Sequence, residues 1–78
     1  MIAYVSVKVD PGKEYDVAQE IGKIDGIAEA ALTYGFSDIL LKVNVESIEA
    51  LNELVFNKIR KIQGIKDTQT VIVSEYLL

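Results

Sequence analysis

The sequence contains no cysteine, no histidine and no tryptophan, and its 78 residues include a single proline. Without cysteine the chain has no disulfide, no thiolate metal ligand and no thiol nucleophile. Without histidine it lacks the most common general base and the most common metal ligand. We therefore expect no metal, no cofactor and no catalytic residues, because a catalytic site would have to be built from carboxylates, lysine, tyrosine, serine and threonine alone.

Positive charge is also scarce. The chain has eight lysine and arginine residues and twelve acidic residues, which gives a net charge of −4. This balance argues against direct binding to nucleic acid, because phosphates are neutralised by clustered lysine and arginine. No signal peptide and no apolar run of membrane-spanning length is present, so we expect a soluble, cytoplasmic protein without membrane contact. Half of the residues are hydrophobic, which is enough for the core of one domain over residues 1–78.

The spacing of the apolar residues predicts four strands and two helices in the order βαββαβ. Alternation of apolar and polar residues indicates strands at Ile2–Val9, Ile27–Tyr34, Asp38–Val45 and Thr68–Tyr76. Apolar residues three and four apart predict one helix over Lys13–Lys23 and a second that begins at the N-cap Ser47. This order is typical of a ferredoxin-like α+β sandwich, in which a four-stranded antiparallel sheet carries both helices on one face.

The second helix is expected to bury one apolar stripe, and glycine is expected to end both helices. The stripe consists of Ile48, Leu51, Val55, Ile59 and Ile62. Gly26 and Gly64 each follow an apolar residue and a polar one, so we expect them to stop the helices in the left-handed conformation.

Such a fold leaves one face of the sheet without helices. We expect that open face to carry Tyr4, Ser6, Lys8, Leu40 and Lys42. The orientation of the last strand stays open, because Val71 and Val73 compete with Thr70, Ile72 and Tyr76 for the core. Either orientation leaves an apolar row on the surface, so we expect a second subunit to cover this face or an edge of the sheet. The alternative is a monomer with scattered apolar surface residues.

We expect one cluster of residues not to be needed for folding. The run Tyr34-Gly35-Phe36-Ser37-Asp38 forms the expected hairpin tip, and Thr68-Gln69-Thr70 opens the last strand. Asp38 could bind an ammonium group while backbone N–H groups bind a carboxylate, as a zwitterion requires. The same residues also suit a plain turn, with positive φ at Gly35 and an Asp38 side chain that satisfies the turn amides. The residues alone leave both interpretations open.

Two segments resemble motifs of the Lrp/AsnC family, the leucine-responsive and asparagine-responsive regulators. The run from Tyr34 to Val43 is similar to that family's Gly-x-x-Asp hairpin, and the run from Ile59 to Val73 is similar to its Gly-Val-x-x-Thr-x-Thr strand. The resemblance covers nearly the whole chain but only the regulatory half of a full regulator. It therefore predicts a stand-alone RAM domain (regulation of amino acid metabolism) that lacks the helix-turn-helix.

The resemblance implies a homodimer formed through the open sheet face, and further assembly that can reach octamers. It also implies that an amino acid effector binds between dimers. Gly35 and Asp38 would contact the charged groups of the effector. The remaining expected site residues are Tyr34, Phe36, Ser37, Ile48, Thr68, Gln69 and Thr70.

The leading hypothesis is therefore an oligomeric effector-binding module that modulates transcription through a full-length Lrp/AsnC regulator in mixed assemblies. A purely structural oligomerisation module with a vacant site is the first alternative. A small dimeric enzyme of the ferredoxin-like type, such as a monooxygenase, is the second. The poor supply of acid–base side chains disfavours the enzyme.

Overall fold

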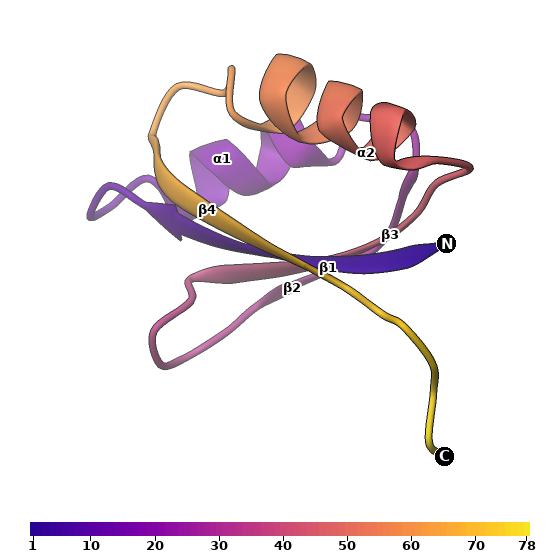
Figure 1. Cartoon of the computed structure of the whole chain (residues 1–78). Helices are drawn as coiled ribbons and strands as arrows, with labels where there is room; N and C mark the ends of the chain where they lie inside the picture. Colours follow the sequence, from indigo (N-terminus) through magenta and orange to yellow (C-terminus); the bar gives the residue numbers. More distant parts are fainter.

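The computed structural model describes all 78 residues, and its elements follow the expected βαββαβ order. The elements are β1 (Ile2–Val9), α1 (Glu14–Ile21), β2 (Ile27–Leu32), β3 (Ile39–Asn44), α2 (Ile48–Leu54), the π-helical turn η1 (Val55–Ile59) and β4 (Ile65–Ile72). All strand pairs are antiparallel, and the sheet order is β2-β3-β1-β4. Both helices cover the same face of the sheet, so the predicted ferredoxin-like α+β fold is confirmed (Figure 1).

β1 lies in the middle of the sheet and pairs with β3 on one side and β4 on the other. Val7 has Ile39 and Thr68 as its neighbours across the strands, so these three side chains share the helix-covered face. Tyr4 is opposite Lys42 and Ser6 is opposite Leu40, so this second set lies on the open face as predicted.

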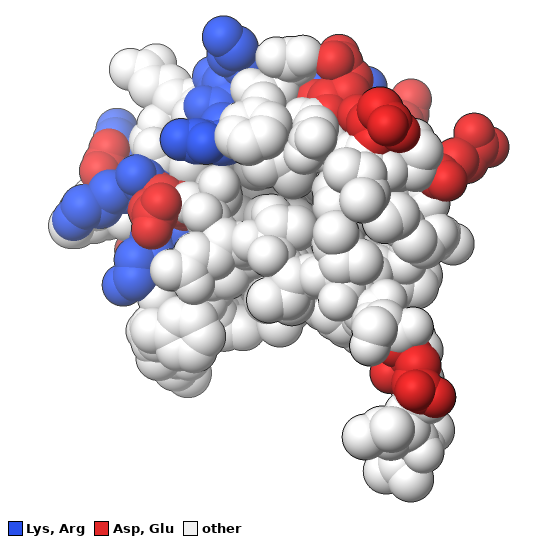
Figure 2. Space-filling view, in the orientation of Figure 1, with Lys and Arg blue, Asp and Glu red and all other residues white.

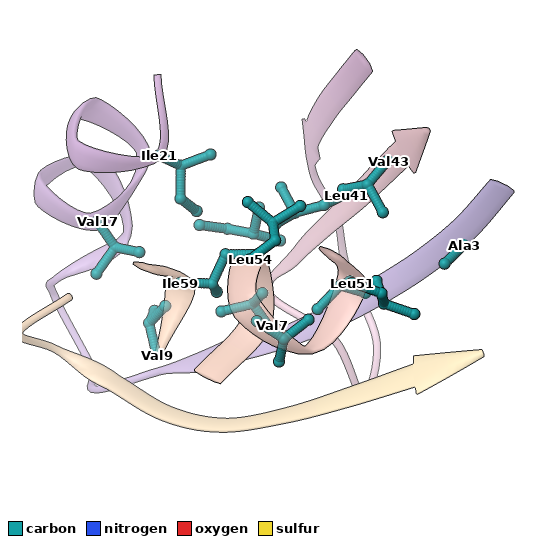
Figure 3. Packing of buried hydrophobic residues seen from close by; sticks show 13 residues of the cluster. Ala3, Val7, Val9, Val17, Ile21, Leu41, Val43, Leu51, Leu54 and Ile59 are labelled. Atoms are coloured by element: carbon teal, nitrogen blue, oxygen red, sulfur yellow. The ribbon is translucent and has the colours of Figure 1, made fainter. Parts of the chain in front are cut away.

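The core lies between the helix-covered face of the sheet and the two helices. Figure 3 shows side chains of both helices pointing toward those of β1 and β3. From α1 come Val17 and Ile21, and from the second helical segment come Leu51, Leu54, Val55 and Ile59. The strands contribute Ala3, Val5, Val7, Val9, Ile39, Leu41 and Val43.

The pairing of β4 with β1 settles the orientation of the last strand. Thr70 and Ile72 lie opposite Val5 and Ala3 on the helix-covered face, whereas Val71 lies opposite Tyr4 on the open face. The alternative that placed Val71 in the core is therefore wrong, and this side chain is 62% exposed. Placing Tyr76 in the core is wrong as well, since its hydroxyl lies 3.3 Å from the Tyr4 hydroxyl of the open face.

The bounds of β4 differ from the prediction at both ends. The strand starts at Ile65, because a bulge between Lys8 and Val9 lets Ile65 pair with Val9. It stops at Ile72, since β1 begins at Ile2 and offers no further partner after the bond from Val73 N–H to the Ile2 carbonyl. The remaining residues form a tail that leaves the sheet on its open side (Figure 1).

The first helix is shorter than predicted and does not end at Gly26. It stops at Ile21 with Gly22 as a right-handed C-cap, and the next two N–H groups bond three residues back instead of four. This tightening ends the helix before the left-handed glycine is reached. Gly26 does have a positive φ of 96°, but it serves the turn into β2.

The second helix begins as predicted and then widens. The Ser47 side chain accepts a hydrogen bond of 3.1 Å from the Ala50 N–H, which confirms the N-cap. The bond from Arg60 N–H to the Val55 carbonyl, at 2.8 Å, spans five residues and closes the π-turn η1. The helix therefore ends before Gly64, and its buried stripe gains Leu54 but excludes Ile48. Neither helix is long and apolar enough to cross a lipid bilayer.

Two isoleucines of the second helical segment provide a matched test of this packing. Ile59 is fully buried, whereas Ile48 is 53% exposed. We expect Ile59→Ala to lower the free energy of unfolding by about 2–5 kcal/mol, because it leaves a cavity in the core. We expect Ile48→Ala to change it by no more than about 0.5 kcal/mol. Urea unfolding followed by circular dichroism measures both, and equal losses would contradict the placement of these side chains.

Candidate ligand-binding site

The β2–β3 hairpin is closed by hydrogen bonds between its two ends. The Thr33 N–H donates to the Asp38 carbonyl at 3.0 Å, and the Thr33 hydroxyl donates to the Ser37 carbonyl at 2.6 Å. Gly35 at the tip has φ of 113°, a conformation that side chains with a Cβ rarely adopt. Gly35 therefore has the positive φ that the turn interpretation of the sequence predicted.

Asp38 fixes the base of this hairpin to the central strand. Its carboxylate Oδ2 accepts a hydrogen bond of 2.9 Å from the Val9 N–H, and its own N–H donates to the Val7 carbonyl at 2.9 Å. The second carboxylate oxygen, Oδ1, has no hydrogen-bond partner within the chain. Asp38 thus has a structural bond on one oxygen and a free acceptor on the other.

Ser37 has a structural role. Its side chain is 7% exposed, and its hydroxyl donates to the Ile39 carbonyl at 3.0 Å. This bond satisfies the only buried polar side chain among the core residues, so the hydroxyl does not face solvent.

A cavity of about 350 Å³ lies between the start of α1 and this hairpin. Two of the predicted site residues, Tyr34 and Asp38, line it together. The sequence interpretation missed its other lining residues, which are Glu14, Tyr15, Leu32 and Thr33. Topology is the signal that could have found them: Glu14 follows β1 after one short turn and Asp38 precedes the antiparallel β3, so both lie at the same end of the sheet.

The hairpin tip carries unpaired backbone donors, of which that of Tyr34 belongs to a residue that lines this cavity. The N–H groups of Tyr34, Gly35 and Phe36 make no hydrogen bond within the chain, because the hairpin is closed through Thr33 and Asp38 instead. Unpaired N–H groups next to a free carboxylate oxygen can bind opposite charges of one small molecule.

A second depression of similar size, about 330 Å³, lies around the start and the polar face of α1 but has a different lining. It contains no hydrophobic residue and is bordered by Asp10, Lys13, Asp16, Glu20, Gln63 and Gly64. No group of three or more ligating side chains is placed to hold a metal ion. Small-molecule sites combine apolar walls with a few polar groups, so the cavity at the hairpin is the better candidate.

The other predicted site residues lie elsewhere in the chain. Phe36 and Gln69 border a small depression on the open face, beside Ser6 and Lys8. Thr68 and Thr70 are on the helix-covered face of β4, separated from the hairpin by β1. Ile48 starts α2, at the opposite end of the sheet from the hairpin. One chain therefore brings together only part of the predicted set.

The bond from Val9 to Asp38 can be tested separately from any ligand. Asp38→Ala leaves the Val9 N–H without an acceptor, and we expect a loss of about 1–3 kcal/mol in the free energy of unfolding. Asp38→Asn retains an acceptor oxygen and should lose less. Amide hydrogen exchange at Val9 measures the bond directly, with faster exchange expected in the alanine variant. Unchanged protection of Val9 in that variant would show that Asp38 does not hold the hairpin.

Comparison with known proteins agrees with this architecture. Residues 2–77 match the Lrp/AsnC ligand binding domain. An uncharacterized HTH-type transcriptional regulator of Pyrococcus furiosus is 32% identical over 74 residues, which cover 95% of this chain and 50% of that protein. The chain thus spans about half the length of the curated relatives it matches.

Solved structures show the same relation. AsnC of E. coli superposes with a TM-score of 0.94 at 27% identity, over 99% of this chain and 52% of the other. A Neisseria meningitidis regulator solved in complex with L-Met shares the fold, with a TM-score of 0.84 at 18% identity over 99% of this chain and 51% of its own. The chain belongs to the Lrp/AsnC family, and these residues form its ligand-binding (RAM) domain.

Proposed function

We propose that this domain binds a free amino acid as an effector and that the cavity at the β2–β3 hairpin forms part of the binding site. RAM domains of the Lrp/AsnC family bind effectors and oligomerise. The observation that carries the proposal is that Asp38, with a free carboxylate oxygen, and Tyr34, with an unpaired N–H, line one cavity. A zwitterion needs both of these partners.

The two charged groups of the effector would bind to different parts of the hairpin. The ammonium group would bind to Oδ1 of Asp38, since Oδ2 is already occupied by the Val9 N–H. The carboxylate would accept hydrogen bonds from the unpaired N–H groups of Tyr34 and Gly35. The Val9 bond holds the Asp38 carboxylate in place before the effector arrives, which reduces the entropy cost of binding.

Two further observations support an amino acid as the ligand. The volume of about 350 Å³ lies at the small end of ligand pockets, which suits a single amino acid better than a nucleotide. The Neisseria meningitidis regulator, which shares the fold, was solved with L-Met.

We also propose that the domain assembles through its open face and the adjoining edge strand β4. Leu40 and Val71 are 38% and 62% exposed on this face, and Phe36 at its border is 75% exposed. The tail extends on the same side and ends in Leu77 and Leu78, which are almost fully exposed (Figure 1). A stable monomer rarely leaves so much apolar surface in water.

The distribution of charge favours a second copy of the chain as the partner for the β4 edge. Figure 2 shows charged side chains mainly around the helices and at one end of the molecule, with a broad uncharged area between them and the tail. A like-charged copy, also at −4, can approach this area without strong repulsion. Neighbouring subunits would also unite the predicted site residues that one chain keeps apart.

An effect on transcription would then pass through DNA-binding segments outside these 78 residues. The residues described here form the ligand-binding domain, and their net charge of −4 does not favour phosphate contacts. Mixed assembly with a full-length Lrp/AsnC regulator would supply such segments.

Isothermal titration with each of the twenty amino acids tests the binding proposal. We expect at least one to bind, and we expect Asp38→Asn to weaken it about tenfold or more because the ammonium loses its charged partner. Asp25→Asn is the matched control, since Asp25 lies in the turn after α1 and does not line the cavity. If no amino acid binds, the domain is a purely structural module.

Sedimentation velocity tests the assembly proposal. We expect the native chain to sediment as a dimer or larger species and Leu40→Glu to shift it toward monomer, because the substitution buries a charge in the interface. Phe56→Glu is the control, since Phe56 is 51% exposed on the helix side. A monomeric native chain, or dissociation by Phe56→Glu alone, would contradict an interface on the open face.

A further inference from the structure

We infer that the effector of this domain carries a second positive charge, as lysine, ornithine and arginine do, and that Glu14 binds it. This inference rests on the proposed function, since it concerns the same cavity. It follows from the two carboxylates and the two tyrosine rings at the cavity. A neutral amino acid has only one cationic group to pair with them.

The cavity has two carboxylates and no cation. Glu14 reaches it from the first turn of α1, and Asp38 reaches it from the base of the hairpin. Neither takes part in the two ion pairs of the chain, which join Lys23 to Glu20 and Lys42 to Glu29. A neutral amino acid brings one ammonium group, so it would leave one of these carboxylates without compensation.

The two carboxylates are not equivalent. Asp38 is held by the Val9 N–H and has one free oxygen, which suits the α-ammonium group that every amino acid carries. Glu14 makes no hydrogen bond or ion pair within the chain, and its longer side chain comes from a different element. Glu14 is therefore the residue available to recognise the end of the effector side chain.

The walls between these carboxylates suit an aliphatic stem that ends in a cation. Leu32 is 50% exposed, and the rings of Tyr15 and Tyr34 are 74% and 105% exposed, so each offers apolar surface to a ligand. Aromatic faces attract ammonium and guanidinium groups. A flexible stem packed on Leu32 would place its charged end near the rings and Glu14.

The helix dipole does not reverse this preference. The start of α1 carries a partial positive charge of about half a unit, which alone would repel a cation. Lys13 at the N-cap adds one positive charge, and the two carboxylates of Glu14 and Asp16 in the first turn still exceed the sum of that charge and the partial charge. The net charge of −4 for the whole chain acts in the same direction.

Titration of the native chain with L-lysine and L-norleucine tests the inference, because norleucine has the same stem without the terminal ammonium. We expect lysine to bind about tenfold more tightly or better, and we expect sodium chloride to weaken lysine more than norleucine. Glu14→Gln should remove most of the lysine advantage. Asp16→Asn is the matched control, since it removes a charge from the same helical turn without touching the cavity.

Other outcomes distinguish this inference from the proposed function. Equal or tighter binding of norleucine by the native chain would contradict the inference that the effector carries a second positive charge. It would leave the proposal of amino acid binding intact. An equal loss of both ligands in Glu14→Gln would overturn the role of Glu14 as the side-chain partner. No binding of any amino acid would remove the proposed function and the inference together.

Discussion

The position of β1 between β3 and β4 is the constraint on which the rest of the structure depends. Since side chains alternate along a strand, β1 sends Val5 and Val7 into the core and Tyr4 and Ser6 to the open face. A shift of β1 by one residue against its neighbours would exchange these two sets. The hydrogen bond from the Val9 N–H to the Asp38 carboxylate lies at the end of this ladder. The register of β1 against β3 therefore also sets the position of the hairpin.

Much of the fold could be predicted from the sequence because strand and helix periods are local. The alternation from Ile2 to Val9 fixed β1 at both ends, and Ser47 marked the start of the second helix. The missed boundaries depend on partners that no local pattern contains. β4 ends where β1 has no more residues to pair, and the π-turn that starts at Val55 packs both Val55 and Ile59 into the core.

The candidate site could be predicted only in part, for a related physical reason. Asp38 was identified because an acid next to a glycine turn suits both structure and binding, and the structure gives one of its oxygens a structural partner. Glu14 gave no such signal, since an acid in the first turn of a helix is already explained by the helix dipole. The antiparallel pairing of β1 and β3 brings Glu14 to the hairpin end of the sheet, and the packing of α1 there places it at the same cavity as Tyr34.

The hairpin tip connects the two proposed activities. Tyr34 lines the cavity, whereas Phe36, two residues along the same loop, borders the open face beside Ser6 and Lys8. A ligand that orders this loop through Tyr34 and Asp38 also restricts Phe36, and a subunit that covers Phe36 also restricts Tyr34. Because coupling between two binding events is reciprocal, an effector that strengthens assembly must itself bind more tightly to the assembled form. The short loop, held at its base by the bond to Val9, thus joins the proposed effector site to the proposed subunit interface.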